Sequence, residues 1–582
     1  MIERDSGRIG SCYKLLQSDR GYRIEVIGKS DPNLVRGGSM RSRSPKLNGP
    51  SDDGWIATPD LAPDFRGPQN NSFPRFVDPA IAPPIIELLR TVTGRQPDRI
   101  AFEDDSGRGI TFAEFWRAVG RLAAVIENTR TSGPIGILLP AGTLYAVAVF
   151  ACLAARRLSL LLDENYPEER NAEIADRTKA VLLLVSSNLS HPGFGSGFIV
   201  RNIAAALNDT GIVPEISGEP FDLDAPAFIL STSGSAGRPK ALVHSQRTML
   251  HWVRTLHDAM HIRPEDRVLS VSSPSSLGGF TSLLTFPLAA ASSQMFEIKQ
   301  AGFGGLLNVL SSRPITIFRA APSLLRALCQ HRDLAKSAIA RLRIAQTYGE
   351  PLLKSDVTEL REILPPSCLI RTTYGSTEAS GLSWFAGEPD DHDPTRVATG
   401  TLMPDTRGSI VDESGQPCNL GDAGELLIAS RYNALGEWTE GRLIPGRLEP
   451  DPADPRVRIF RTGDIARCSL DGVFVVLGRK DRMAKINGQR VELSEVETAL
   501  RRLESVAGAE VVFQDEDGRT KLTAFVVPNE PAPDRLPQLL RRQLATSLPP
   551  FMIPSRIVLL DSIPCLPGGK VDTAALLRLL DA

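Results

Sequence analysis

The sequence predicts an α/β fold in which a large domain of parallel-rich sheets is followed by a small α+β domain. Short, apolar and partly β-branched runs at residues 135–139, 180–185 and 315–318 have the character of buried strands. They alternate with helical patterns at residues 112–126 and 324–331. This alternation is typical of parallel strands whose crossover helices cover the sheet.

The character of the sequence changes near residue 478, which predicts a second domain. The stretch 478–481 (GRKD) separates a hairpin-like segment at 471–476 from the last hundred residues. Two helical patterns and two strand-like runs follow, at 494–503, 536–547, 508–512 and 522–527. We therefore expect a large domain over residues 76–478 and a small α+β domain over residues 479–582.

Residues 1–75 differ from the rest and predict a disordered tail or an over-extended start, with Met40 as an alternative initiator. The first fifty residues hold ten Lys and Arg against five Asp and Glu, a local charge of +5, and are rich in Ser, Pro, Asn and Gly. A partner-binding or nucleic-acid-binding arm is the weaker alternative, because aromatic residues are sparse and no basic block is long.

The composition favours a soluble, cytoplasmic protein of two or more domains. The 582 residues exceed one hydrophobic core, and the net charge of −2 gives no bulk attraction to nucleic acid or to a membrane. Seven scattered cysteines without a CxxC pair indicate free thiols rather than disulfides or zinc. The N-terminus lacks an apolar signal core, and the longest apolar stretch, 144–155, is too short for a bilayer and predicts a buried helix.

The segment 231–240 (STSGSAGRPK) predicts a loop that binds a polyphosphate. Hydroxyl donors, flexible glycines and one mobile cation are its useful groups: Ser231, Thr232, Ser233 and Ser235, Gly234 and Gly237, and Lys240. A Ser/Gly linker is the alternative, but an apolar strand-like run at 227–230 precedes the loop and a Pro-Lys pair closes it. The P-loop of nucleotidases is excluded, because the lysine follows a proline and no Ser or Thr comes next.

Three further segments carry groups that suit a nucleotide. Residues 374–378 (YGSTE) offer an aromatic face for a purine, a hydroxyl for a phosphate and a carboxylate for Mg²⁺. Asp464 follows a tight turn and could accept hydrogen bonds from ribose hydroxyls, while Lys570 lies on a glycine-rich loop at 567–572. Taken singly, each has an ordinary alternative: a helix cap, a turn aspartate and a solvated surface lysine. The segment 478–493 adds charge and glycine at the domain junction.

In this order and spacing the segments resemble those of the adenylate-forming ligases, a family that includes acyl-CoA synthetases, luciferases and the adenylation domains of nonribosomal peptide synthetases. The resemblance covers residues 76–582, with further matches at 110–115, 163–170, 348–351 and 424–426. The stretches DENYPEER (163–170) and GQRVELSEVE (488–497) are more similar to the peptide-synthetase branch, in a stand-alone form. The family implies a β-barrel-like subdomain within the large domain and a mobile small domain.

The resemblance also implies a reaction. Such enzymes use ATP and Mg²⁺ to convert a carboxylic acid into an acyl-adenylate with release of pyrophosphate. They then transfer the acyl group to a thiol, either coenzyme A or the phosphopantetheine of a separate carrier protein. The residues implied as catalytic are Lys570, Thr377, Glu378 and Lys240.

Individual roles follow from the same resemblance. The loop 231–240 would hold the β- and γ-phosphates, Tyr374 would stack on adenine, Thr377 would bind the α-phosphate and Glu378 would hold Mg²⁺. Gly349 and Glu350 would border the nucleotide, and Asp464 and Arg479 would bind the ribose. Lys570 would bridge the substrate carboxylate and a phosphate oxygen. Asp481 would be the hinge, and the segment around Gly488 would line the path of the thiol.

The expected substrate pocket departs from that of amino-acid-activating members. Its wall residues would be Leu277, Gly278, Thr281, Arg319, Gln346, Tyr348, Thr373, Gly381 and Leu382. Leu277 stands where those members have the aspartate that binds the α-ammonium group, so an ordinary α-amino acid is disfavoured. Arg319 suggests a substrate with a second acidic or polar group, and the alternative is a protein carboxylate that pairs with Arg319.

Four functions are compatible with the sequence. The first is a free-standing carboxylic-acid:carrier-protein ligase, because nothing that resembles a carrier domain follows Lys570 and the chain ends twelve residues later. The second is an acyl- or aryl-CoA ligase, and the third is an enzyme that adenylates an unusual amino acid. The fourth is an inactive homologue that serves as a scaffold, against which Lys240, Glu378, Asp464, Arg479 and Lys570 are all retained.

Overall fold

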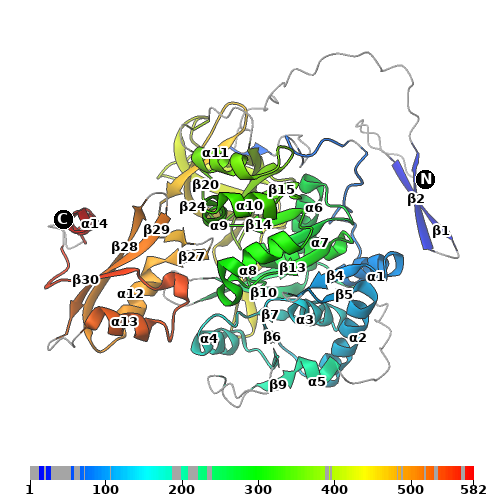
Figure 1. The fold of residues 1–582 in the computed structure, drawn as a ribbon, viewed down its shortest axis with the longest axis horizontal. Helices are drawn as coiled ribbons and strands as arrows, with labels where there is room; N and C mark the ends of the chain where they lie inside the picture. Colours follow the sequence, from blue (N-terminus) through cyan, green and yellow to red (C-terminus); the bar gives the residue numbers. More distant parts are fainter. Residues whose placement is uncertain are drawn as a thin grey trace. The chain divides into compact units, whose positions relative to one another are not determined.

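The chain divides into two units, Met1–Lys46 and Leu47–Ala582, which are described separately. The computed structural model describes residues 12–18, 21–27, 54–57, 64, 66–70, 72–104, 107–186, 194, 198–207, 221–232, 239–386, 392–393, 396–480, 483–486, 489–516, 519–529, 535–564 and 571–581. In the first unit, β1 (Cys12–Ser18) pairs with β2 (Gly21–Ile27) as an antiparallel hairpin (Figure 1). This hairpin differs from the disordered tail expected for this region.

The first sheet of the second unit has eight strands in the order β22-β21-β11-β10-β7-β6-β8-β9. Strands β10, β7, β6, β8 and β9 run parallel, as the apolar runs predicted. The strands are β6 (Ile135–Leu138), β7 (Ser159–Leu161), β8 (Leu182–Val185), β9 (Ile199–Asn202), β10 (Pro226–Thr232), β11 (Lys240–Ser245), β21 (Gly436–Thr439) and β22 (Arg442–Ile444). The helices of this part are α1 (Ile85–Arg95), α2 (Phe112–Asn128), α3 (Thr143–Ala154), α4 (Glu168–Thr178) and α5 (Ile203–Leu207).

The second sheet has nine strands in the order β18-β17-β16-β15-β14-β12-β13-β4-β5, parallel from β4 to β16. Its strands are β4 (Ile100–Glu103), β5 (Gly109–Thr111), β12 (Arg267–Ser270), β13 (Ser292–Met295), β14 (Ile317–Ala320), β15 (Ile344–Tyr348), β16 (Leu369–Gly375), β17 (Ser380–Ala386) and β18 (Thr401–Leu402). The helices are α6 (Gln246–Met260), α7 (Leu277–Leu288), α8 (Ile298–Ser312), α9 (Pro322–Cys329), α10 (Arg332–Ala338) and α11 (Lys354–Ile363).

The largest hydrophobic core joins these two sheets. It contains Phe102 of β4 and Phe228 of β10, and between them Phe115 of α2, Phe150 of α3 and Phe280 of α7, all buried. The apolar stretch at 144–155 is the buried helix α3, whose residues from Tyr145 to Ala154 are all buried. Among the described residues, no helix has the length and apolar character that crossing a membrane requires.

A third sheet is antiparallel and occupies the place of the predicted β-barrel-like subdomain. Its order is β23-β24-β20-β19-β3, with β25 paired to β24. The strands are β3 (Ile56–Ala57), β19 (Arg407–Val411), β20 (Ala423–Ser430), β23 (Leu448–Pro450), β24 (Arg458–Cys468) and β25 (Phe474–Arg479). Its core includes Leu426, Phe460 and Phe474.

The C-terminal elements form a small α+β domain with a core of its own, drawn in orange and red in Figure 1. The elements are β26 (Met483–Ile486), β27 (Gln489–Glu492), α12 (Leu493–Arg501), β28 (Val506–Glu516), β29 (Arg519–Pro528), α13 (Leu536–Leu544), η1 (Pro550–Met552), β30 (Arg556–Leu559) and α14 (Thr573–Asp581). Leu500 of α12, Val511 of β28, Ala524 of β29 and Leu540 of α13 meet in that core. The predicted mixed α/β class with a small C-terminal domain is thereby confirmed.

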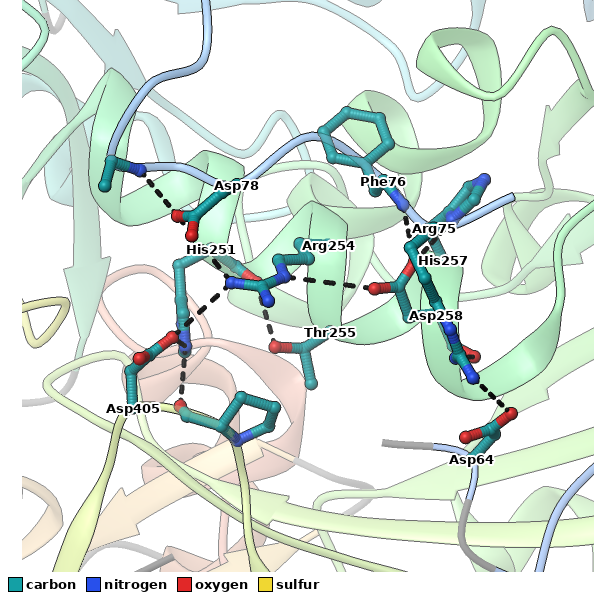
Figure 2. A network of polar contacts seen from close by, with 12 residues as sticks. Asp64, Arg75, Phe76, Asp78, His251, Arg254, Thr255, His257, Asp258 and Asp405 are labelled. Carbon is teal, nitrogen blue, oxygen red and sulfur yellow. Dashed lines mark hydrogen bonds and ion pairs between the residues drawn. The ribbon is translucent and has the colours of Figure 1, made fainter. Parts of the chain in front are cut away.

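Residues between 64 and 78, expected in part to belong to a tail, instead pack against helix α6. His261 and Arg75 both bond the carboxylate of Asp64, at 2.5 and 2.8 Å, and the backbone N–H of Phe76 donates to Asp258 Oδ1 at 2.7 Å. Figure 2 shows the contacts of Arg75 and Phe76. It also shows Arg254, whose Nη1 lies 3.7 Å from Asp78 Oδ1. The segment is thus fixed to the helix that forms one wall of the cavity described next.

Candidate functional site

A cavity lies at the carboxyl ends of the parallel strands. Its walls come from the end of β10, the β12–α7 connection, the ends of β14, β15 and β16, and the small domain. The lining residues are Tyr166, Arg170, Ser231, Thr232, Trp252, Leu256, Ser272, Ser275, Ser276, Leu277, Gly278, Thr281, Arg319, Ala321, Tyr348, Gly349, Thr373, Tyr374, Gly375, Ser376, Thr377, Gln489, Phe551 and Met552. The carboxyl edge of a parallel sheet is where ligands bind in open α/β folds.

Backbone close to the cavity is shaped by two glycines. A Cβ atom on Gly278 would lie 2.5 Å from Cε2 of Tyr348, so the tyrosine ring packs directly on the backbone of α7. The Tyr348 hydroxyl lies 2.8 Å from Ser272 Oγ, which fixes the ring across the cavity wall. Gly349 has a φ of 86°, the left-handed region that favours glycine, and this turn follows β15 directly.

Several of the expected nucleotide-binding residues lie together on this cavity. Ser231, Thr232, Gly349, Tyr374 and Thr377 are all lining residues. The phenol of Tyr374 donates a hydrogen bond to Asp464 Oδ2. The residue expected to bind the purine therefore lies beside the residue expected to bind the ribose. Asp464 lies opposite Arg479 in the β24–β25 pairing.

Lys240 and Glu350 are placed differently from the lining residues. Lys240 is paired with Thr232 across the β10–β11 hairpin, so it lies next to a lining residue where the expected phosphate loop ends. The carboxylate of Glu350 accepts hydrogen bonds from the backbone N–H and the hydroxyl of Ser323, both at 3.0 Å. Glu350 therefore binds the first turn of α9 and does not line the cavity among the described residues.

Glu378 directly follows the lining residue Thr377 and is buried. A carboxylate next to a hydroxyl, at the place expected to bind a phosphate, fits Mg²⁺, which prefers oxygen ligands and is commonly held by one or two carboxylates together with phosphates and water. Buried His244 lies against this turn, where its interaction with the backbone of Thr377 favours the protonated ring. Its pKa is lowered from 6.5 to about 4, chiefly by burial, so the imidazole is neutral near pH 7.

Some expected residues lie outside the described part of the chain. They are Ser233, Gly234, Ser235, Gly237, Asp481, Gly488 and Lys570, together with the side chain of Arg479. Their roles remain predictions from the sequence.

The expected substrate pocket is largely assembled on the same cavity. Its lining includes Leu277, Gly278, Thr281, Arg319, Tyr348 and Thr373. Gln346 is buried on β15, two residues before the lining residue Tyr348. Gly381 and Leu382 lie on β17 and are not lining residues among the described ones, and Leu382 packs in the core of the third sheet.

Among the residues that the structure describes, Arg319 has neutral partners only. Its guanidinium donates to Gly278 O at 3.3 Å, to Thr281 Oγ1 at 3.4 Å and to Ser282 Oγ. Within the described part of the chain, no carboxylate forms an ion pair with Arg319. Of the two explanations that the sequence left open for this arginine, pairing with a protein carboxylate therefore finds no support in the described structure.

Three features of the cavity were not predicted from the sequence. Phe551 and Met552 of the small domain line the cavity and belong to no motif, whereas Gln489 lies beside Gly488, whose segment was expected to line the path of the thiol. Tyr166 and Arg170 lie in the stretch DENYPEER, which carries the family resemblance but predicted no place in the pocket. A second buried arginine, Arg371, adjoins the pocket floor through strand pairing, for which the sequence has no local signal.

The large and small domains also make direct contact beside the cavity. Arg170 Nη1 lies 2.6 Å from Glu495 Oε1, and both side chains are buried. The rings of Tyr166 and Phe551 have centroids 6.3 Å apart. The DENYPEER stretch thus connects the cavity wall to the small domain.

Comparison with known proteins agrees with this geometry. The AMP-binding enzyme family model matches residues 89–438, and the model of the AMP-binding enzyme C-terminal domain matches residues 495–570. The fold and the site are those of the adenylate-forming ligase superfamily. The chain belongs to the AMP-binding enzyme family.

Similar proteins include peptide synthetases and a CoA ligase. A dimodular nonribosomal peptide synthase of Bacillus subtilis (strain 168) is 29% identical over 509 residues, which are 82% of this chain and 20% of that protein. The artificially fused adenylation–PCP di-domain NpsA-ThdA from Klebsiella oxytoca has a TM-score of 0.70 and 21% identity, over 81% of this chain and 86% of that one. The o-succinylbenzoate CoA synthetase from Bacillus subtilis has a TM-score of 0.71 and 19% identity, over 84% and 98%. The chain thus spans about a fifth of the length of the peptide synthase, and the solved structures share its fold.

Proposed function

We propose that this chain activates a carboxylic acid with ATP as an acyl-adenylate, releases pyrophosphate, and then transfers the acyl group to the phosphopantetheine thiol of a separate carrier protein. The observation that carries the proposal is the shared cavity. Thr232, Tyr374 and Thr377, which suit a nucleotide, line the same space as Leu277 and Arg319, which suit an acid.

In the first half-reaction a carboxylate oxygen attacks the α-phosphorus, a new P–O bond forms, and the bond to pyrophosphate breaks. Both reactants are anionic, so the site must neutralise charge as the transition state forms. In this proposal the hydroxyl of Thr377 binds the α-phosphate and the loop that starts at Ser231 guides the pyrophosphate. Lys570 bridges the two reacting anions.

The nucleotide would be oriented by residues at the other end of the cavity. Tyr374 would stack on adenine, while its hydroxyl holds Asp464 ready to accept from the ribose, together with Arg479. Glu378 would hold Mg²⁺. Bound with the nucleotide, that ion would neutralise phosphate charge.

In the second half-reaction the thiol sulfur attacks the acyl carbon, the C–O bond to AMP breaks, and AMP departs. Support comes from the small domain, because Gln489, Phe551 and Met552 line the cavity beside the nucleotide residues. This position suits the predicted role of the segment around Gly488 in lining the path of the thiol. Rotation about Asp481 would exchange this segment for the Lys570 loop between the two half-reactions.

The acceptor is proposed as a carrier protein because the relatives include peptide synthetases and one neighbour is an adenylation–PCP fusion. Coenzyme A is the second candidate, which the CoA synthetase neighbour favours. We also propose that the acid lacks an α-amino group, since Leu277 lines the cavity and has no charge to pair with an ammonium.

The proposal is tested by pyrophosphate release with ATP·Mg²⁺ and a panel of carboxylic acids. At full turnover, AMP should form together with pyrophosphate only when both an acid and a thiol acceptor are present. Each active acid is then assayed with coenzyme A and with phosphopantetheinylated carrier proteins. Formation of ADP and phosphate, or turnover that needs no acid, would contradict the proposed reaction.

A further inference from the structure

Three long polar side chains lie in one row across the second sheet, at the floor of the substrate pocket. Strand register places Arg319 of β14 beside Gln346 of β15, and Gln346 beside Arg371 of β16. In parallel strands, paired residues project to the same face of the sheet. That face is the one covered by α7, because Arg319 donates to Gly278 O and Ser282 Oγ.

The row lies directly below the pocket. Tyr348 and Thr373 are the pair two residues further along β15 and β16, and both line the cavity. Arg319 is itself a lining residue, and the ring of Tyr348 lies 5.2 Å from its guanidinium carbon. Gln346 and Arg371 continue the row behind it.

All three side chains are almost fully buried, with exposed fractions of 2% for Arg319 and 0% for Gln346 and Arg371. Within the described chain, none of the three guanidinium nitrogens of Arg371 has a hydrogen-bond partner. Neither amide atom of Gln346 has one either. The guanidinium of Arg371 does contact the face of Phe385, 5.8 Å away.

The buried row therefore contains two guanidinium groups, those of Arg319 and Arg371. No carboxylate of the described residues pairs with either of them. Burial, and after it the charge of Arg319, lower the pKa of Arg371 to about 9. Burying an unpaired charge is costly, and an adjacent like charge adds to that cost. Asp266, near the amino end of β12, does not compensate them because Arg343 pairs with it.

We propose that the acid activated by this enzyme carries a second carboxylate, which binds at the pocket floor between Arg319 and the amide of Gln346. This inference rests on the proposed function, since it assigns the end of the substrate remote from the reacting carboxyl group. Arg371 supplies the second positive charge behind Gln346. The carboxylate oxygens then satisfy the guanidinium and the amide N–H, while the carbonyl oxygen of Gln346 accepts from Arg371.

Other occupants fit this floor less well. An apolar tail would leave both cations and the amide unsatisfied, and a neutral hydroxyl would satisfy one donor without balancing the charge. An ammonium group would be repelled by both arginines. The position of Leu277 in the pocket wall, without charge, agrees with a substrate whose recognition depends on an anion deeper in the pocket.

The test uses ATP–pyrophosphate exchange by the full chain with matched acids. Linear dicarboxylates from succinate to azelate and the three benzenedicarboxylates are each compared with the monocarboxylate in which a methyl group replaces the second carboxyl group. We expect at least one dicarboxylate to exceed its partner by roughly 100-fold or more in kcat/KM, because a site built for a polar group rejects the analogue that lacks it. Equal or better exchange with the monocarboxylates overturns the inference and leaves the proposed function standing.

A binding measurement covers the case in which no acid supports exchange. Thermal unfolding is followed with each acid alone and with ATP·Mg²⁺ alone, since a ligand that binds the native state raises the Tm. A Tm increase with a dicarboxylate but not with its partner supports the inference, and no increase with any dicarboxylate overturns it. Absence of any ATP·Mg²⁺ response contradicts the proposed function itself.

Two variants separate the substrate role from a structural one. Arg319→Met should abolish the preference for the dicarboxylate while the Tm increase with ATP·Mg²⁺ persists. Arg371→Met should weaken the preference and should not lower the Tm of the free protein, because it removes an uncompensated buried charge. The matched control is Arg343→Met, which breaks the pair with Asp266 and should lower the Tm. A Tm loss for Arg371→Met as large as that of the control, with the preference unchanged, would assign Arg371 to the fold and overturn its part in recognition.

Discussion

Arg170 of α4 and Glu495 of α12 form a buried ion pair between the large and small domains. Their Nη1 and Oε1 atoms are 2.6 Å apart, with side chains 7% and 2% exposed. Because Arg170 lines the cavity, this contact connects the position of the small domain directly to the site.

Replacing Glu495 with Gln should impair acyl transfer more than adenylation. The change leaves the Arg170 charge buried without its partner, at a cost of about 3–5 kcal/mol if the contact were kept. The small domain should instead move away from its contact with Arg170. Transfer from a preformed adenylate should then slow by roughly tenfold or more. Single-turnover transfer and pyrophosphate exchange measure the two steps separately.

The matched control is Arg501→Gln on the same helix. Arg501 is half exposed and pairs with Glu510 inside the small domain, so its loss should leave both steps nearly unchanged. Equal loss of both half-reactions in Glu495→Gln would show that the pair acts through general stability.

Lys570→Ala should abolish adenylate formation and spare the transfer step. In the proposed reaction Lys570 neutralises the two anions that meet at the α-phosphorus, and removal of such a group costs roughly 100-fold or more. Pyrophosphate exchange reports the first step, and thioester formation from synthetic acyl-adenylate reports the second. Lys336→Ala, on exposed α10, is the control. A parallel fall in both steps would remove Lys570 from the proposed role.

Gly278→Ala should weaken the use of the acid without affecting the nucleotide. The added methyl group meets the ring of Tyr348, which is held by Ser272, so the pocket wall must shift. Overpacking of this size predicts roughly 5- to 100-fold lower kcat/KM for the acid. The Tm increase with ATP·Mg²⁺ is the second readout.

Gly304→Ala in α8 is its control, because a Cβ atom there has no neighbour within 4 Å. Unchanged acid kinetics in Gly278→Ala would mean that the acid does not contact this wall.

The stability of the protein should decrease as the pH falls from about 6.5 to about 4. Burial lowers the pKa of His244 and of His251 from 6.5 to about 4 in the folded state. Between these values the unfolded chain binds more protons, so the free energy of unfolding rises with pH, by up to about 3 kcal/mol for each histidine. Urea unfolding across this pH range measures the slope.

Substituting either histidine with Gln should flatten that slope, whereas His331→Gln at an exposed position should not change it. A slope that is the same in all three variants would assign the pH dependence to other groups.

Much of the fold could be predicted from the sequence because its signals are local. The periodicity of 112–126 predicted α2, which begins at Phe112 after a Thr111–Glu114 capping box, and the apolar run at 135–139 predicted β6. The motifs expected to bind the nucleotide are equally local, so the family resemblance was enough to expect Thr232 and Thr377 near each other.

What the sequence could not predict depends on pairing over long separations. Arg319 and Arg371 lie in one row only because β14 and β16 both pair with β15, which places Gln346 between them. The pairing of Arg170 with Glu495 joins residues 325 positions apart. Glu350 shows the reverse effect, since its position in a motif suggested the nucleotide, while the nearby start of α9 takes up its carboxylate.

The attachment of residues 64–78 to α6 sets a practical limit for shortening this chain. A variant that begins near Leu47 keeps the contact between Asp64 and Arg75. It also keeps the contact between Asp64 and His261. A variant that begins at Ala82 would leave the buried carboxylate of Asp258 without the Phe76 N–H and the imidazole of His261 without its acid. The helix that loses these partners presents Trp252 and Leu256 to the cavity, so removing this surface segment should also alter the cavity wall.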